Sequence, residues 1–244
     1  MDLGLSEWKV LVTGASSGLG RAIAEGFIAE GATVMACGRN PEHPMPDGAH
    51  ASMCADLTQP GGAAAVVGAT VDRLGGLDAV IAAAGGAVPG SVEDASEEAW
   101  GRGLELNLLS VVRMVRLALP HLRQRGGRIV ILSALSASEP RADHVISNVS
   151  KSGVAALAKS LSREVADDGI LVNCVAPGRM RSAQMDRAFA DEQARARFAD
   201  AHIPLRRFGT PEEVVPVTLL LGSPRNTYIT GQTVGVDGGM AWSL

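Results

Sequence analysis

Near its start the sequence reads Thr13-Gly14-Ala15-Ser16-Ser17-Gly18-Leu19-Gly20, a glycine-rich turn. Residues 9–12, just before it, have the length and apolar character of a buried strand, and residues 21–27 begin a helical pattern. Glycines at these spacings allow a tight turn and bring backbone N–H groups close to a pyrophosphate at the positive end of the helix. Strand, turn and helix together predict a dinucleotide site, whereas glycines alone would also fit a bare turn.

Apolar runs of strand length alternate with helical patterns through the rest of the chain, which is typical of a doubly wound sheet. Seven strands are predicted, at residues 9–12, 33–37, 49–54, 78–82, 128–132, 171–174 and 233–236. We therefore expect an α/β fold, a single Rossmann domain over residues 1–244 with a mostly parallel seven-stranded sheet and helices on both faces. The polar stretch 179–207, which is rich in Arg and Ala, is a candidate substrate lid.

Two helices have clear signals in the sequence. Apolar residues recur at spacings of three and four and predict one long helix that Ser96 caps; they are Leu104, Leu108, Val112, Val115, Leu119 and Leu122. Thr210-Pro211-Glu212-Glu213 resembles a capping box with Pro at the first helical position, which predicts a helix running toward Leu221.

Composition limits the possible functions. The chain is 46% hydrophobic and 20% charged with a net charge of -4, which indicates a globular protein and not a nucleic-acid binder. Cys37, Cys54 and Cys174 are odd in number and far apart, so neither a disulfide framework nor a metal motif is expected, and a cytoplasmic location fits best. The first residues lack an export signal, and no apolar run approaches the roughly 18 residues of a membrane span.

Further motifs resemble, in order along the chain, those of the short-chain dehydrogenase/reductase family, and in particular its FabG-like members. Besides the glycine turn, the matching elements are Asp56-Leu57, which resembles the adenine-contacting pair, Ala84-Gly85, Asn107 of a helix, Lys151 as the catalytic Lys, the Pro177-Gly178 turn, Thr230-Gly231-Gln232 and Val236-Asp237-Gly238-Gly239. The resemblance implies cofactor contacts at Gly14, Ser16, Ser17, Gly18, Leu19, Gly20, Arg39, Asp56, Leu57, Ala84, Gly85, Lys151, Pro177, Gly178 and Met180.

The resemblance also has implications for partners. It implies a small-molecule substrate, with acyl thioesters among the candidates, and a homo-oligomer, a dimer or tetramer, paired through the helices at 96–122 and 150–165. A nucleic-acid partner, membrane insertion and a metal site are not expected.

The second predicted strand ends in Ala36-Cys37-Gly38-Arg39. An enzyme that prefers NAD would place an acidic residue at about Gly38 to bind the ribose hydroxyls, and glycine cannot do this. Arg39 offers a guanidinium that can pair with a 2′-phosphate, although a solvated loop cation would look the same. We therefore expect NADP(H) in preference to NAD(H).

The catalytic positions depart from the family pattern. In family members a Tyr four residues before the Lys exchanges the proton of a carbonyl group, and a Ser positions the carbonyl oxygen. Here Ser147 stands four residues before Lys151, and Ala134 stands at the position of the Ser, flanked by Ser133 and Ser136. The only tyrosine, Tyr228, lies just before the last predicted strand. Since a serine hydroxyl is much less acidic than a phenol, whose pKa is about 10, ordinary ketone reduction is not expected.

The candidate catalytic residues are Asn107, Ser147, Lys151 and His144. A partial resemblance to 2,4-dienoyl-CoA reductases, which have Ser-x-x-x-Lys, implies that the first three can act as hydrogen-bond donors to an enolate. That branch also uses a Tyr from another loop, at about the position of Ser136 here. Structural alternatives remain: Ser147 as a helix cap, Asn107 as a residue that kinks its helix, and His144 as a solvated imidazole instead of a proton donor.

Three functions remain open at this point. The first is an NADP(H)-dependent oxidoreductase with an altered proton donor, acting on an activated C=C bond or a carbonyl group. The second is a cofactor-binding protein or scaffold without hydride transfer. The third is a lyase or isomerase that reuses the pocket, since a fold does not determine its chemistry.

Overall fold

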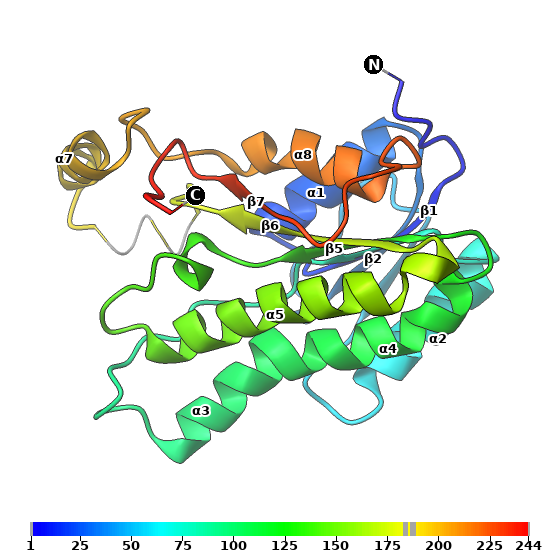
Figure 1. Ribbon diagram of the computed structural model, residues 1–244, viewed down its shortest axis with the longest axis horizontal. Helices are drawn as coiled ribbons and strands as arrows, with labels where there is room; N and C mark the ends of the chain where they lie inside the picture. The colour runs from blue at the N-terminus through cyan, green and yellow to red at the C-terminus, as the bar shows by residue number, and fades with distance from the viewer. Residues whose placement is uncertain (1, 183–184, 186–188, 244) are drawn as a thin grey trace.

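The computed structural model describes residues 2–182, 185 and 189–243, and it contains one seven-stranded parallel sheet (Figure 1). The strand order is β3-β2-β1-β4-β5-β6-β7. The strands are β1 Lys9–Thr13, β2 Thr33–Gly38, β3 Ala51–Cys54, β4 Ala79–Ala82, β5 Arg128–Leu132, β6 Leu171–Pro177 and β7 Thr233–Val236. The predicted fold class is confirmed, with every predicted strand in place and its ends shifted by three residues or fewer.

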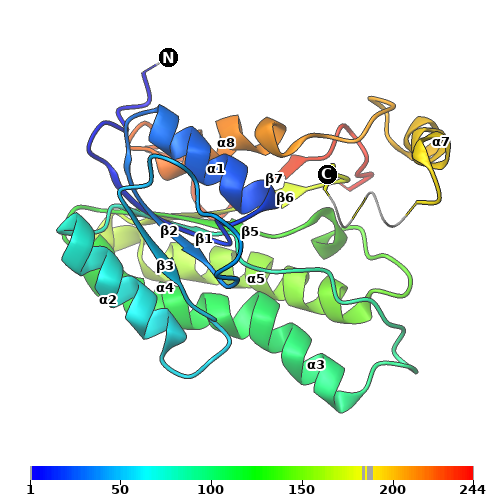
Figure 2. The same cartoon turned by 180° about the vertical axis from the view of Figure 1, so that it is seen from behind.

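Helices cover both faces of the sheet (Figures 1 and 2). They are α1 Gly18–Ala29, α2 Gly62–Leu74, α3 Glu97–Leu104, α4 Ser110–Leu122, α5 Val145–Glu164, α7 Glu192–His202 and α8 Val215–Gly222. Short 3₁₀ turns lie at η2 Leu135–Ala137, η3 Ala166–Asp168 and η4 Pro211–Val214, and η1 Glu105–Leu109 is a π turn.

The alternation of side chains along the strands produces two separate cores. In β1, Val10 and Val12 belong to the core under α1 and α8, while Leu11 belongs to the core under α2, α4 and α5. Both cores are fully buried at these positions, so the strands read as continuous apolar runs in the sequence. This is why the strand positions could be predicted from hydrophobicity alone.

The predicted long helix is present, with an interruption. Ser96 is its N-cap, and its hydroxyl accepts a hydrogen bond from the backbone N–H of Ala99 at 3.2 Å. The helix then passes from α3 through the π turn η1, which contains Asn107, into α4. A π turn of this kind often marks a functional site. The capping box at Thr210 is also present, although the first turn after it is the 3₁₀ turn η4 and α8 follows.

The sheet order reverses between β1 and β4, which is where ligands bind in folds of this kind. The carboxyl ends of β1, β2, β4, β5 and β6 lie along one edge, so the motifs that follow these strands meet there. Thr13, the last residue of β1, ties the two central strands together, since its hydroxyl accepts hydrogen bonds from the backbone N–H groups of Ala83 and Ala84 at 3.2 Å each.

Part of the predicted lid, residues 183–184 and 186–188, lies outside the described residues. The remainder contains α7. Phe198 and Ala199 of this helix form a small hydrophobic cluster with Ile203, just after the helix, and Phe208. None of the helices in the described ranges has the length and apolar character needed to cross a membrane.

Candidate active site

The glycine turn after β1 has the backbone geometry that the sequence predicts. Gly14 and Gly18 have positive φ angles of 69° and 55°, which glycine adopts without strain. A Cβ atom on Gly20 would lie 2.3 Å from the carbonyl oxygen of Gly14, whereas one on Gly18 would meet no other atom within 4 Å. The turn is therefore packed tightly on its inner side and open on its outer side at the N-terminus of α1. This open side fits the pyrophosphate of a dinucleotide.

At the end of β2, the side chains of Ser16 and Met45 pack closely on Gly38. A Cβ atom on Gly38 would lie 2.8 Å from the hydroxyl oxygen of Ser16. Arg39 is exposed, and its guanidinium has no hydrogen-bond partner among the residues described. Its charge reaches Asp56: partial burial raises the pKa of that carboxyl, but hydrogen bonds from Thr58 and the charge of Arg39 outweigh it, so the pKa of Asp56 is lowered overall.

Two predicted cofactor residues place their side chains in the core. Leu57 is 6% exposed and Met180 is 8% exposed, and each belongs to a hydrophobic core of the sheet. Of these two residues, only the backbone groups are available to contact a nucleotide, so the side-chain contacts that the family resemblance implies are fewer. The Pro177-Gly178 turn packs closely on the segment after β7, since a Cβ atom on Gly178 would lie 2.7 Å from the Cα atom of Asp237.

Asn107, Lys151 and Gly85 meet at the end of β4. The side-chain amide of Asn107 forms two hydrogen bonds with Gly86: its oxygen accepts from the backbone N–H at 2.9 Å, and its nitrogen donates to the carbonyl oxygen at 3.0 Å. A Cβ atom on Gly85 would lie 2.8 Å from the Asn107 oxygen and 3.3 Å from Lys151 Nζ. The side chain of Asn107 thus ties Gly86 to the π turn, and its catalytic role stays a prediction.

Lys151 lies in α5 and points across the site. Its Nζ donates a hydrogen bond to the carbonyl oxygen of Leu132 at 2.9 Å. Burial lowers the pKa of Lys151 from 10.5 to about 8 because the charged form loses hydration. A group that titrates this close to neutral pH is suited to proton transfer.

Both sides of the Ser147 hydroxyl are occupied. It accepts a hydrogen bond from the backbone N–H of Val88 at 2.7 Å and donates one to the carbonyl oxygen of Val88 at 3.1 Å. Ser147 is only 6% exposed. It is also not a helix cap, because His144 occupies the N-cap position of α5. Ser147 therefore clamps the loop after β4 to α5, an arrangement that competes with its predicted role as a donor to substrate.

The serines on either side of Ala134 differ in their availability. The Ser133 hydroxyl donates to the backbone carbonyl of Lys151 at 3.0 Å, so it is engaged in holding α5. The Ser136 hydroxyl, in η2, has no hydrogen-bond partner within the described part of the chain, and this residue lines the same cavity as Lys151. Ser136 is thus the serine best placed to meet a substrate oxygen.

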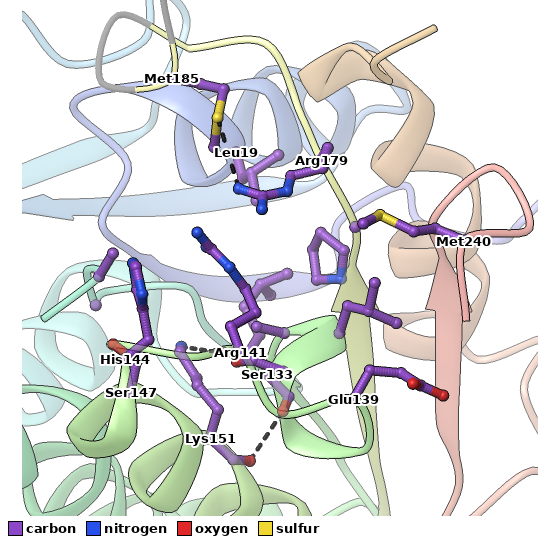
Figure 3. Close-up of a pocket in the computed structure, with 18 of the residues that line it drawn as sticks. Leu19, Ser133, Glu139, Arg141, His144, Ser147, Lys151, Arg179, Met185 and Met240 are labelled. Atoms are coloured by element: carbon purple, nitrogen blue, oxygen red, sulfur yellow. Dashed lines mark hydrogen bonds between the residues drawn. The ribbon is translucent and has the colours of Figure 1, made fainter. Parts of the chain in front are cut away.

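A cavity of 430 Å³ joins these groups (Figure 3). Its lining includes Leu19, Gly85, Ser136, Glu139, Arg141, His144, Ser147, Lys151, Pro177, Gly178, Arg179, His202, Met240 and Trp242. The structure therefore brings His144, Ser147 and Lys151 to one cavity. His144 Nδ1 lies 3.0 Å from the carbonyl oxygen of Ala142.

Sequence reasoning missed three charged residues of this cavity, Glu139, Arg141 and Arg179. Arg179 directly follows the Pro177-Gly178 turn, so its position beside a motif was a usable signal. Arg141 lies in the segment between η2 and α5, which carries no motif. Across the described ranges, no group of three or more His, Cys, Asp or Glu side chains is arranged to hold a metal ion.

Comparison with known proteins agrees with this geometry. The family model described as enoyl-(acyl carrier protein) reductase matches residues 14–241. The 3beta-hydroxysteroid dehydrogenase 1 of Eggerthella lenta is 37% identical over 242 residues, covering 95% of this chain and 92% of that protein. The 3-oxoacyl-[acyl-carrier-protein] reductase FabG of Vibrio cholerae is 35% identical over 241 residues, covering 96% and 98%.

Two solved structures match almost the whole chain. L-sorbose reductase from Gluconobacter frateurii, in complex with NADPH and L-sorbose, is 32% identical, with a TM-score of 0.93 and complete coverage of both chains. An NADPH-bound short chain oxidoreductase from Pseudomonas aeruginosa PAO1, described as containing an atypical catalytic center, is 31% identical, with a TM-score of 0.91 and coverage of 98% of this chain and 100% of that one. This chain belongs to the short-chain dehydrogenase/reductase family and is an oxidoreductase of that family.

Proposed function

We propose that the protein is an NADP(H)-dependent reductase of a carbonyl group or an activated C=C bond that does not take its proton from the residue four positions before Lys151. The observation that carries the proposal is the state of two hydroxyls: that of Ser147 is tied to Val88 in both directions, and that of Ser136 is unpaired in the same cavity as Lys151. The site thus still offers a lysine and a hydroxyl donor to the substrate, but the hydroxyl is that of Ser136 and not that of Ser147.

The preference for NADP(H) rests on the end of β2. Ser16 fills the space beside Gly38, so no carboxylate is present there to repel a 2′-phosphate, and the Arg39 guanidinium beside it is unpaired within the described residues. The NADPH in the solved structures of L-sorbose reductase and of the Pseudomonas oxidoreductase is consistent with this choice. When bound, NADPH supplies the hydride.

The proposed chemistry assigns separate tasks to two side chains. Ser136 donates a hydrogen bond to the substrate oxygen, where negative charge develops as hydride arrives. Lys151, with a pKa of about 8, releases a proton to that oxygen and regains one from solvent. For an activated C=C bond the same donors stabilise the enolate, and water protonates the carbon. Residues 179–207 border the cavity through Arg179 and His202, and we propose that they cover it when substrate is bound.

The test is NADPH oxidation, followed by absorbance with small ketones, β-ketoacyl thioesters and enoyl thioesters. Binding of NADPH is first established by its fluorescence. We expect Ser136→Ala and Lys151→Met each to lower kcat roughly 100-fold, within the 10²–10⁴ range of positioned acid catalysis. Ser138→Ala is the matched control, because Ser138 is exposed and its hydroxyl donates to the carbonyl of Leu135. Full activity of Ser136→Ala, or a kcat as low for Ser147→Ala as for Lys151→Met, would reject this assignment.

A second function is favoured by one specific observation. Ala134 has no hydroxyl, and the hydroxyl of Ser147 is hydrogen-bonded to Val88. Neither of the two positions that the family uses to bind and protonate the carbonyl oxygen therefore offers an unbonded hydroxyl to substrate. A cofactor-binding scaffold without turnover has this appearance. NADPH binding without oxidation by any member of the panel would support the scaffold and reject the reductase.

A further inference from the structure

Two arginines line the cavity, and among the residues that the structure describes neither has an acidic partner. Arg141 lies between η2 and α5, and Arg179 follows β6, so elements far apart in the sequence bring them together. Figure 3 shows their guanidinium groups pointing toward one another. The charge of Arg141 is felt at Arg179: burial and then this neighbouring charge lower the pKa of Arg179 to about 10. Two cations thus share one small space.

The contacts of these side chains do not neutralise them. Arg179 stacks over the ring of Phe198, with 5.0 Å from its guanidinium carbon to the ring centroid, and its Nη1 lies 3.9 Å from the sulfur of Met185. The backbone of Arg141 pairs with the Asn148 side chain, at 3.3 Å and 2.8 Å, which fixes the loop and leaves the guanidinium unused. Within the described residues neither arginine forms a salt bridge.

The carboxylate in the described lining of the cavity binds other groups. Glu139 is the only acidic residue in the described lining of the cavity. Its Oε1 accepts hydrogen bonds from the backbone N–H groups of Trp242 at 3.0 Å and Ser243 at 2.7 Å, and it points away from the arginines (Figure 3). The hydrogen bond from Ser243 lowers the pKa of Glu139, so the carboxylate stays ionised in that role. No carboxylate among the described residues therefore compensates the positive charge of the two arginines.

We infer that the substrate is a small anion whose carboxylate or phosphate group binds between Arg141 and Arg179 while its reducible end lies at Ser136 and Lys151. The second half of this statement rests on the proposed function. A planar guanidinium matches both oxyanions through paired hydrogen bonds. The charge of the oxyanion would replace the hydration that each guanidinium loses on burial. The cavity of 430 Å³, lined also by Gly85, Lys151 and the Pro177-Gly178 turn, has a volume within the range of small-molecule sites.

The experiment measures ligand binding by calorimetry to the protein saturated with NADP⁺. The oxidised cofactor cannot give a hydride to the ketone probes, and with the cofactor bound its phosphates cannot occupy the arginines. The probes are matched pairs: 4-oxopentanoate and its methyl ester, 2-oxobutanoate and its methyl ester, and dihydroxyacetone phosphate and dihydroxyacetone. Arg141→Met and Arg179→Met are compared with Arg125→Met, whose exposed side chain lies just before β5, at the opposite end of the sheet. The affinity for NADP⁺ is measured for each variant first.

We expect at least one anion to bind tenfold or more tightly than its neutral partner. Each of the two cavity variants should weaken that anion 10–100-fold and leave its neutral partner unchanged, while Arg125→Met has no effect. Selective binding of the acids or of the phosphate ester identifies the group. Equal affinities within every pair, or equal anion affinity in the cavity variants, overturns the inference. Failure to bind NADPH, or binding without oxidation, rejects the reductase and leaves anion binding to be judged by the same pairs without cofactor.

Discussion

The proposed preference for NADP(H) depends on Arg39. Its guanidinium has no hydrogen-bond partner among the described residues. Arg39 follows Gly38 at the carboxyl end of β2, where Ser16 packs closely against the glycine. Removing one charge-assisted contact costs roughly 1.5–3 kcal/mol, so Arg39→Ala should weaken NADPH binding about 10–100-fold. Binding of NADH, which lacks the 2′-phosphate, should barely change. Calorimetry with both cofactors checks this, and equal losses for the two would count against the preference.

At Lys151 the prediction concerns pH. Below about pH 8 the lysine is protonated in both states, and its buried charge costs stability. Between pH 8 and 10.5 the folded protein loses this proton before the unfolded chain does, so the unfolded chain binds more protons and stability rises with pH.

We therefore expect the free energy of unfolding to rise more between about pH 8 and pH 10 in the unmodified protein than in Lys151→Met. Urea titrations at the two pH values measure it. A difference between the two proteins that does not change with pH would show that Lys151 is not a titrating group in this window.

Restoring the family residues tests whether their loss is what limits ketone reduction. Ala134→Ser plus Ser147→Tyr should raise the rate of NADPH oxidation with ketones by about 10²-fold or more if positioned acid catalysis is the missing contribution. The structure adds a cost, because Ser147→Tyr removes both hydrogen bonds to Val88. Ser147→Ala, which removes the same bonds without adding a phenol, is the matched control. Efficient ketone reduction by the unmodified protein would refute the idea.

Among the elements, the helix from α3 to α4 shows what local sequence can determine. The cap at Ser96 depends on residues three apart, and its hydroxyl accepts from Ala99 as the sequence predicts. Ser96→Ala should therefore lower the free energy of unfolding by roughly 1 kcal/mol, and Ser96→Asp should retain most of it. Urea denaturation of both variants measures this effect. An equal loss in the two would mean that the cap is not the cause.

The elements also show where sequence reasoning ends. Buried strands and the glycine turn were predictable because apolar runs and positive φ angles are local properties. Ser147 and Val88 are 59 residues apart, and no pattern around Ser147 indicates that its hydroxyl is bound to that loop. The facing of Arg141 and Arg179 likewise depends on the packing of η2, α5 and β6. The geometry of the glycine turn was therefore predictable from sequence, whereas the hydrogen bonds of the Ser136 and Ser147 hydroxyls were not.

For the whole molecule, the outer faces of the helices carry apolar residues that one chain does not cover. Leu109 at the π turn is 43% exposed, and Val149 in α5 is 47% exposed. These helices are the two through which the family resemblance implies pairing, and α4 and α5 lie side by side on one face of the sheet (Figures 1 and 2). Pairing about a two-fold axis would bring the same surface of each chain together.

We predict a dimer or tetramer at micromolar concentration, measured by light scattering. Leu109→Glu combined with Val149→Glu should shift the mass toward that of one 25.2 kDa chain, because a carboxylate buried at an apolar interface loses its hydration without a partner. Val92→Glu is the control, since Val92 is 69% exposed and lies outside these helices. An unmodified protein of monomer mass would reject the prediction. If the double variant keeps the mass of the unmodified protein, the two new carboxylates lie in solvent. The interface between chains is then on another face of the molecule.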